Sequence, residues 1–360
     1  MGDIPSLALS FDDVLVLPGL SQVLPGDVDI GTTFGGSIRL NIPVLSSAMD
    51  TVTEAELAIA LAREGGLGVI HRNCPIDYQA EQVAKVKRSE NTVIQNPHCV
   101  KPETTLGELQ RLMHEKGVSG FPVIDPSGRL LGMVTSRDMW YIDDETTPVS
   151  AIMTNRDRLA TGTPGTSFDE ALKILYTHRI EKLPLVDAEG RLAGLITKQD
   201  VVKRQMFTSA AKDANGQLRV GAAVGVGDDC AERGAALVAA GADALFIDAA
   251  TGHTTRVADV IARLRAKVGG EIPIVAGNVV TADGARHLID AGASAIKVGV
   301  GPGSICTTRI ISGVGMAQFT AVQEAASVCR ERGVSVIADG GIRYSGDIVK
   351  ALAAGADCVM

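Results

Sequence analysis

The tripeptide Ala-Gly-Ala recurs in the C-terminal half of the chain, and each copy leads directly into an apolar run. The copies begin at Ala240, Ala291 and Ala354, and each follows an alanine-rich stretch with helical spacing. Glycine often ends a helix because it readily adopts the left-handed backbone of the C-terminal cap. Each copy therefore predicts a helix end, a glycine cap and the start of a strand. Strands that alternate with helices predict a parallel sheet.

Eight apolar runs of strand length fit this pattern, and eight strand–helix units are the number found in a (β/α)8 barrel. Aromatic residues make up only 3% of a chain that is 46% hydrophobic, so small aliphatic residues dominate, which suits strands buried on both faces. No helix follows the last run, so we expect an α/β fold of the TIM-barrel type that is truncated in its eighth strand. The expected strands are 41–50, 66–72, 219–225, 244–250, 273–279, 295–301, 335–341 and 357–360.

The middle of the chain contains an internal repeat. Residues 121–138 align without gaps on residues 183–200, and eight of the eighteen positions are identical. Each copy has the pattern helix, strand, turn, strand, helix, which predicts a compact module inserted after the second barrel strand. The expected domains are 1–91 for the first part of the barrel, 92–207 for the module, with halves of about 92–145 and 146–207, and 208–360 for the rest of the barrel.

Charge and apolar patterning exclude several classes of protein. The formal net charge is −8 and no run of lysine and arginine occurs, which argues against nucleic acid as the main partner. The N-terminus lacks a basic leader, and no stretch of eighteen apolar residues could span a membrane, so we expect a soluble, cytoplasmic protein. The cysteines have neither zinc spacing nor the setting of a disulfide framework. They are Cys74, Cys99, Cys230, Cys306, Cys329 and Cys358.

Polar residues or glycines follow most of the predicted strands, and barrel active sites lie at the C-terminal ends of strands. An ordinary loop explains any one of these segments, since glycine and asparagine form turns and aspartate caps helices. Their occurrence at most strand ends together favours a functional site. The segments are 46–50, 71–74, 248–253, 277–278, 299–315 and 339–341.

The segment 299–315, GVGPGSICTTRIISGVG, is the most informative of these loops. It superficially resembles a dinucleotide fingerprint, but such a turn should open directly into a helix, whereas Cys-Thr-Thr-Arg and a second glycine pair follow here. Its unshielded backbone groups and the Ser304 hydroxyl can bind a phosphate or a cation. Cys306 lies among them close to Arg309, where a thiol has a lowered pKa and acts as a nucleophile. An inert core cysteine is the alternative, which this polar setting disfavours.

Asp339 with Gly340 and Gly341 fits a phosphate site late in the barrel, and its carboxylate could bind sugar hydroxyls. Asp248 could bind a second nucleotide in the same way. The residues alone therefore indicate a barrel that binds a phosphorylated, hydroxyl-bearing substrate beside a nucleophilic cysteine.

At this point the chain resembles a known family, that of inosine-5′-monophosphate (IMP) dehydrogenase and GMP reductase. The resemblance rests on the segments 9–18, 46–73, 219–225, 299–315 and 338–348, and the repeat resembles a pair of CBS modules. It implies a (β/α)8 barrel, a homotetramer or possibly an octamer, and the reaction IMP + NAD⁺ + H₂O → XMP + NADH with a monovalent cation such as K⁺. The departures lie after Asp248, where Ala249, Ala250 and Thr251 replace the family's polar residues, and at Ala317, where the family has proline.

The resemblance also implies residue roles. Cys306 attacks C2 of the purine, Thr308 helps to activate water, and the carbonyls of Gly301, Gly303 and Cys306 bind the cation. The family's remaining residues for phosphate binding and hydrolysis would lie beyond residue 360, so we expect impaired hydrolysis if the chain ends there. The implied IMP contacts are Ser47, Met49, Ser304, Asp339, Gly340 and Gly341, and the implied NAD contacts are Asp248, Asn278, Gly299, Val300 and Gly301.

Two alternatives stay open. A GMP reductase shares the Cys-Thr-Thr-Arg string but uses NADPH, and the segments 46–54 and 338–347 favour the dehydrogenase. A non-catalytic nucleotide sensor would use only the repeat, where Thr135 with Asp138 and Thr197 with Asp200 have a spacing that fits the ribose of adenine or guanine nucleotides. These pairs could instead simply cap the helices that follow.

Overall fold

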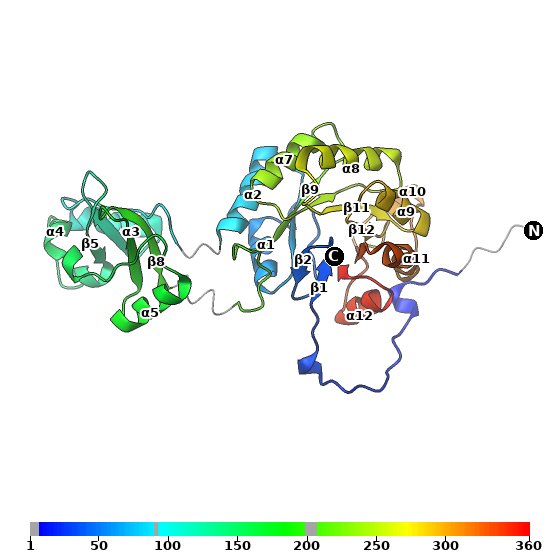
Figure 1. The fold of residues 1–360 in the computed structure, drawn as a ribbon, viewed down its shortest axis with the longest axis horizontal. Coiled ribbons are helices and arrows are strands. Elements are labelled where there is room, and N and C mark those ends of the chain that lie inside the picture. Colours follow the sequence, from blue (N-terminus) through cyan, green and yellow to red (C-terminus); the bar gives the residue numbers. More distant parts are fainter. Residues whose placement is uncertain (1–6, 90–92, 199–206) are drawn as a thin grey trace, which may run out of the picture. The chain divides into compact units, whose positions relative to one another are not determined.

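The computed structural model describes residues 7–89, 93–198 and 207–360, which divide into two compact units (Figure 1). The barrel unit comprises Met1–Glu90 and Ser209–Met360, and the inserted unit comprises Asn91–Thr208. Each unit has its own hydrophobic core, so each is described by itself.

A parallel sheet of seven strands forms the centre of the barrel unit, in the order β14-β13-β12-β11-β10-β9-β3. β9, β10 and β12 are buried along their whole length, as expected for strands of a parallel sheet covered on both faces. The strands are β3 (Gly68–Ile70), β9 (Val220–Val224), β10 (Ala244–Ile247), β11 (Ile274–Val279), β12 (Ala295–Val298), β13 (Ser335–Ala338) and β14 (Cys358–Val359).

The segment around Val44 and Leu45 closes this sheet into a barrel. Leu45 N–H donates to the Val359 carbonyl at 2.8 Å on one side, and Leu67 N–H donates to the Val44 carbonyl at 3.1 Å on the other. The (β/α)8 prediction is therefore confirmed, but the expected strand 41–50 is reduced to two isolated bridges. Pro43 contributes to this difference, since it has no N–H to extend the ladder.

The helices follow the strands in alternation and lie outside the sheet (Figure 1). Gly241, Gly292 and Gly355 have φ angles of 101°, 101° and 109°, which confirms the predicted glycine caps. Within the described ranges, no helix is long and apolar enough to cross a membrane. The barrel helices are α1 (Ala55–Arg63), α2 (Ile76–Arg88), α7 (Cys230–Ala239), α8 (Thr255–Val268), α9 (Ala282–Asp290), α10 (Thr308–Ser312), α11 (Gln318–Arg332) and α12 (Ser345–Ala353).

A hairpin of β1 (Thr32–Phe34) and β2 (Ile38–Leu40) was not predicted, and it packs into the barrel core. The Phe34 ring lies 6.3 Å from that of Phe246 on β10. Two short 3₁₀ helices, η1 (Phe11–Asp13) and η2 (Pro25–Asp27), precede it. The signal for the hairpin was the Gly-Gly pair at 35–36, where both residues have positive φ angles, between short apolar alternations.

The inserted unit shows the repeat as two similar halves. In each half a helix leads to an antiparallel strand pair, β4 with β5 and β7 with β8. The first pair is followed by a short 3₁₀ helix where a full helix was expected, and the helix expected after the second pair lies mostly outside the described residues. The elements are α3 (Leu106–Lys116), β4 (Gly120–Ile124), β5 (Leu130–Thr135), η3 (Ser136–Met139), α4 (Val149–Ile152), β6 (Thr154–Asn155), η4 (Arg156–Arg158), α5 (Phe168–His178), β7 (Lys182–Val186) and β8 (Leu192–Thr197).

Candidate active site

The loop that carries Cys306 begins at Gly299, where β12 ends, and it packs against the loop that follows β13. Gly299 has a φ of 142°, and a Cβ atom there would lie 2.2 Å from the Asp339 carbonyl oxygen. A Cβ atom on Gly340 would lie 3.1 Å from the Gly303 nitrogen. Glycine at these positions therefore lets two neighbouring loops approach closely enough to form one site.

Cys306 is exposed in this loop, and its Sγ lies 3.2 Å from the Thr308 hydroxyl. The pKa of the Cys306 thiol is lowered, chiefly because the Thr308 hydroxyl and also the Thr308 backbone N–H can donate to a thiolate, with a smaller contribution from Arg309. By contrast, burial raises the pKa of Cys329 and of Cys358 to about 12. Cys306 therefore has the exposure and the surroundings of a nucleophile.

A short helix, α10, begins at Thr308 in this loop, although the sequence predicted no helix directly after the glycine turn. It ends at Ser312, and Gly313, with a φ of 70°, forms its C-terminal cap. The Arg309 side chain passes close to Gly301 and Gly315 and donates to the Met316 carbonyl. The two glycine pairs therefore leave room for an arginine that connects the two ends of the loop.

A cavity of about 420 Å³ lies beside the loop, and Ser304 and Gly341 both line it. Its wall includes the N-terminal segment, which is fixed by a hydrogen bond of 2.8 Å from Leu9 N–H to the Thr320 hydroxyl. Gln318 lines the cavity and donates from Nε2 to the carbonyls of Val298 and Asp339, while its buried Oε1 has no partner. The hydroxyl groups of Ser10 and Ser304 and the guanidinium groups of Arg309 and Arg343 also line this cavity, which therefore suits a polar ligand.

Asp339 lies at the centre of a polar cluster inside the barrel. Its Oδ2 accepts from Lys297 Nζ and from Asn278 Nδ2, both at 2.8 Å. Asn278 Nδ2 also donates to the Gly299 carbonyl at 2.7 Å. The three side chains come from neighbouring strands or strand ends, β11, β12 and β13. The carboxylate that sequence reasoning selected is therefore held from two sides.

The loop after β10 joins this cluster from the other side. Gly252 N–H donates to the Asn278 carbonyl at 2.6 Å, and Asn278 N–H donates to the Ala249 carbonyl at 3.2 Å. Asp248 forms an ion pair of 3.0 Å with Arg72, which follows β3. Asn278 Oδ1 is buried without a hydrogen-bond partner.

The candidate cation ligands lie within the same loop. The Gly303 carbonyl accepts the Cys306 N–H at 3.1 Å, and among the described residues the carbonyls of Gly301 and Cys306 accept no hydrogen bond. Carbonyl oxygens of one loop are ligands that a hard monovalent cation can take, so the chemistry of these residues fits such a group. In the described part of the chain, no group of three or more His, Cys, Asp or Glu side chains could hold a metal ion.

The loop with Ser47 and Met49 is placed between the closing segment and α1. The Ser47 carbonyl accepts from the Thr53 hydroxyl at 2.6 Å, and Met49 is 38% exposed. In the described ranges, no hydrogen bond joins this loop to the loop of Cys306. These two candidates therefore share the C-terminal end of the barrel without a hydrogen bond to the nucleophile.

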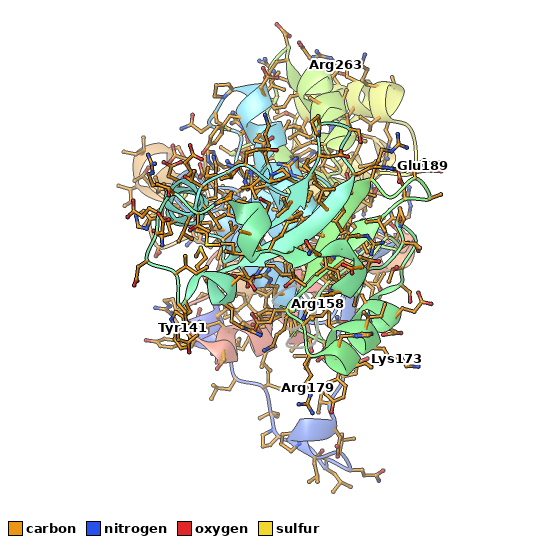
Figure 2. All side chains as sticks on the ribbon, turned by 90° about the vertical axis from the view of Figure 1, so that its left-hand side faces the viewer. Tyr141, Arg158, Lys173, Arg179, Glu189 and Arg263 are labelled. Atoms are coloured by element: carbon orange, nitrogen blue, oxygen red, sulfur yellow. The ribbon has the colours of Figure 1, made fainter. Side chains whose placement is uncertain are left out.

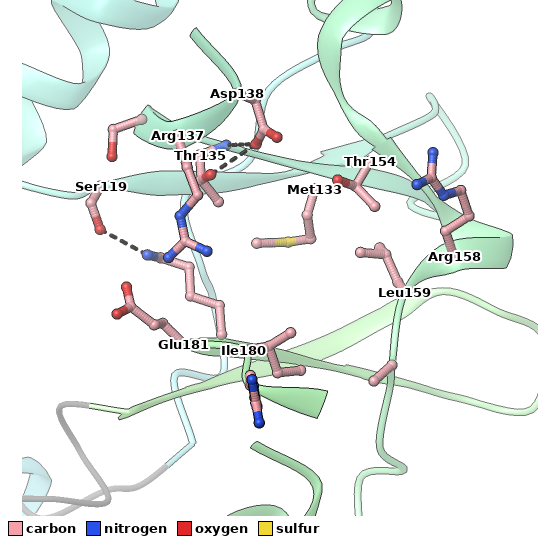
Figure 3. A pocket seen from close by; sticks show the side chains of 14 residues that line it. Ser119, Met133, Thr135, Arg137, Asp138, Thr154, Arg158, Leu159, Ile180 and Glu181 are labelled. Atoms are coloured by element: carbon pink, nitrogen blue, oxygen red, sulfur yellow. Dashed lines mark hydrogen bonds between the residues drawn. The ribbon is translucent and has the colours of Figure 1, made fainter. Parts of the chain in front are cut away.

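The inserted unit has a separate cleft of about 270 Å³, into which both halves of the repeat contribute (Figure 3). Arg158 and Arg179, labelled in Figure 2, line it together with Arg137 and Lys182. Asp138 Oδ2 accepts from the Thr135 N–H and hydroxyl at 2.7 and 2.8 Å, so this pair forms the helix cap that was the alternative reading. Thr197 ends β8, and Asp200 lies outside the described residues.

Sequence reasoning missed two residues of the candidate site, Lys297 and Gln318, and it selected the segment 71–74 without giving Arg72 a role. Lys297 had a clear signal, since it is the charged residue within the apolar run Ala295–Val298, and buried lysines are rare unless paired. The partners of Gln318 and Arg72 had no local signal, because they lie on other strands or strand ends.

Comparison with known proteins supports a common origin. The chain matches the sequence model of the IMP dehydrogenase / GMP reductase domain over residues 8–360. It is 55% identical over 354 residues to the inosine-5′-monophosphate dehydrogenase of Aquifex aeolicus, which covers 98% of this chain and 72% of the relative. It is 53% identical over 353 residues to the inosine-5′-monophosphate dehydrogenase of Streptococcus pyogenes, and this match covers 98% of this chain and 71% of the relative.

Solved structures agree with this fold. A GMP reductase variant from Trypanosoma brucei matches with a TM-score of 0.90 at 40% identity, covering 100% of this chain and 83% of that chain. The T. brucei GMP reductase in complex with guanosine 5′-triphosphate matches with a TM-score of 0.89 at 40% identity, covering 99% and 86%.

Proposed function

The chain belongs to the IMP dehydrogenase / GMP reductase family, and from this premise we propose how its residues act. The protein is an IMP dehydrogenase, an NAD-dependent oxidoreductase that converts IMP to XMP. We assign the nucleophile to Cys306. The observation that carries this assignment is an exposed thiol 3.2 Å from the Thr308 hydroxyl, on a loop packed against Asp339 and Gly340.

The chemistry proceeds in two halves around this sulfur. The Cys306 thiolate attacks C2 of the purine, forming a sulfur–carbon bond as the hydride leaves C2 with its electron pair. Bound NAD⁺ supplies the acceptor for that hydride. Water then adds to C2 of the thioimidate, the sulfur–carbon bond breaks, and XMP and the free thiol result. The Thr308 hydroxyl stabilises the thiolate first and then lies beside the carbon that water attacks.

The substrate is held by groups that surround this sulfur. We place the IMP ribose at Asp339 and the phosphate near Ser304, Gly340 and Gly341, since Ser304 and Gly341 face one cavity. Ser47 and Met49 would line the purine side. Backbone N–H groups and a hydroxyl suit a phosphate because they donate without adding charge.

We place NAD on the side of Asp248, Asn278 and the backbone of Gly299, Val300 and Gly301. The backbone of Asn278 supports this placement, since its carbonyl accepts from Gly252 N–H and its N–H donates to the Ala249 carbonyl, in the loop that follows Asp248. A K⁺ ion would be held by the carbonyls of Gly301, Gly303 and Cys306, where it would order the loop. Each of these assignments concerns this chain's own residues and can be tested by substitution.

Two assays test the proposal. Intact-mass analysis after incubation with IMP and NAD⁺ should show a covalent adduct that Cys306→Ala lacks. Cys74→Ala is the matched control, because Cys74 is a half-buried thiol with a raised pKa. An adduct that persists in Cys306→Ala would contradict the assignment.

The resemblance to solved GMP reductases makes reductive deamination of GMP the competing reaction. Measuring IMP with NAD⁺ against GMP with NADPH separates the two. Activity with the second pair alone would overturn the dehydrogenase assignment.

We also propose that the inserted unit is a CBS pair that binds an adenine or guanine nucleotide and that the protein forms a homotetramer or an octamer. The cleft in Figure 3 supports the first point, because the apolar side chains of Met133, Leu159 and Ile180 approach its middle between Arg137 and Arg158. Apolar surface flanked by cationic groups suits a base and its phosphates. Arg158→Ala should weaken nucleotide binding measured by calorimetry, and unchanged binding would contradict this placement.

A further inference from the structure

A buried lysine lies one strand away from the candidate substrate carboxylate. Lys297 on β12 is only 8% exposed, and the neighbouring side chains of Ala295, Ile296 and Val298 are fully buried. Burying a charge is costly unless it is paired. The partner here is Asp339, whose Oδ2 lies 2.8 Å from Lys297 Nζ.

The two oxygens of Asp339 have different surroundings. Oδ2 accepts from both Lys297 and Asn278. Oδ1 accepts no hydrogen bond from any of the described residues. An ionised carboxylate has about two lone-pair sites on each oxygen, so Oδ2 is saturated and Oδ1 is open.

Two donors on adjacent strands also prevent this carboxylate from turning. Lys297 is fixed by packing inside the barrel, and Asn278 is held by its second bond to the Gly299 carbonyl. Groups supported in this way keep a contact in its productive geometry before the ligand arrives. The open oxygen is therefore held in one direction.

We propose that Lys297 is a positioning residue that fixes Asp339 so that its free oxygen accepts from the ribose hydroxyls of the substrate, and that this pair makes the site select ribonucleotides over deoxyribonucleotides. This inference rests on the proposed role of Asp339 as the IMP ribose contact. When the ligand lacks the hydroxyl, a charged acceptor that is held rigidly and desolvated on binding is left unpaired. The loss of affinity is then largest.

The test compares dissociation constants for IMP, 2′-deoxy-IMP and 3′-deoxy-IMP, measured by calorimetry without turnover. The wild-type chain should bind at least one deoxy analogue roughly 10- to 100-fold more weakly than IMP, as expected for a hydrogen bond to a charged group. Lys297→Met should reduce that ratio to a few-fold, because the carboxylate loses its countercharge and one of its two donors. Lys297→Arg, which keeps the charge, should retain most of the ratio.

Lys87→Met is the matched control. Lys87 is a lysine of similar burial that pairs with Asp213 and Asp243 at the opposite end of the barrel. This variant should lose stability but keep the wild-type ratio. If Lys297→Met does not fold, Lys297→Gln, which keeps a donor without the charge, replaces it and should also show a reduced ratio.

The possible outcomes separate the two hypotheses. If Lys297→Met and Lys297→Gln both keep the wild-type ratio of dissociation constants between the deoxy analogues and IMP, the inference is overturned. If Asp339→Asn also keeps the wild-type ratio, or if the wild type itself binds IMP and both deoxy analogues equally well, the proposed role of Asp339 as the ribose contact is refuted. If Asp339→Asn loses the ratio while the Lys297 variants keep it, Asp339 retains its role and only the positioning by Lys297 is refuted.

Discussion

Lys87 in the last turn of α2 offers a prediction whose size can be derived from the contacts around it. Its Nζ donates to Asp213 Oδ2 and Asp243 Oδ2, both at 2.9 Å, and to the Leu218 carbonyl at 3.1 Å. These partners lie before β9 and β10, so one ammonium group connects the N-terminal ends of two strands to α2. Lys87→Met should therefore loosen this end of the barrel unit.

The expected loss of unfolding free energy is large because the Lys87 ammonium group is buried. The side chains of Lys87 and Asp243 are 8% and 9% exposed, so solvent screens the pair only weakly. Removing the lysine leaves two carboxylates within about 6 Å of each other, where like charges repel. Breaking a buried pair in this way costs about 3–5 kcal/mol of unfolding free energy. For a unit of this size, that lowers Tm by about 2–4 °C for each kcal/mol.

Urea denaturation followed by circular dichroism measures this loss. The two units need not unfold together, so a single two-state transition should not be assumed. Trp140, the chain's single tryptophan, lies in the inserted unit, so its fluorescence follows that unit separately. Lys85→Met is the matched control, since Lys85 lies on the same helix but is exposed. The fluorescence transition should be unchanged in both variants.

The reasoning would be refuted if Lys87→Met were within about 1 kcal/mol of Lys85→Met, since exposed pairs are worth no more than that. A double variant gives a second check. Combining Lys87→Met with Asp243→Asn removes one of the two carboxylate charges that would otherwise repel each other. The loss of unfolding free energy in the double variant should therefore be smaller than the sum of the losses in the two single variants. Additive costs would show that the lysine and Asp243 do not interact energetically.

Two further predictions concern the candidate active-site loops, and a third concerns a cysteine of the barrel core. Alkylation of Cys306 by iodoacetamide should reach half its maximal rate at a lower pH than alkylation of an ordinary thiol, because the pKa of Cys306 is lowered. Thr308→Val should move that midpoint to higher pH. An unmoved midpoint would exclude the Thr308 hydroxyl as the cause of the lowered pKa. Gly299→Ala should weaken IMP binding measured by calorimetry and destabilise the barrel unit by about 1–3 kcal/mol or more, because the new Cβ would meet the Asp339 carbonyl. Gly346→Ala is the control: its Cβ would meet no other atom, so neither IMP binding nor stability should change. Cys358 should react with a maleimide only after denaturation, since burial raises its pKa to about 12 and it is fully buried; modification in the native state would contradict the packing.

Local patterns were sufficient to predict the barrel architecture. The three Ala-Gly-Ala copies depend on a single-residue property, the left-handed backbone of glycine, and the structure shows that backbone at all three. Cys306 was identified in the same way, because a thiol between polar residues and glycines differs from a core cysteine in its immediate neighbours. Features that depend on a few adjacent residues can be read directly from a sequence.

The unpredicted features have partners far away along the chain. The sheet closes through Leu45 and Val359, and the N-terminal segment is fixed by Leu9 and Thr320. The β1–β2 hairpin was missed because strand propensity over three residues is weak without the core that it packs against.

The sequence by itself therefore determined the alternation of strands and helices, the duplicated module and the choice of Cys306 as the candidate nucleophile. Only the tertiary structure decided what surrounds Asp339: that Lys297 and Asn278 together saturate one of its oxygens, and that Asn278 and Gln318 each keep a buried oxygen without a partner. The physical reason is that periodicity encodes which face of an element is buried, whereas hydrogen-bond partners on different strands are set by the register in which the sheet closes.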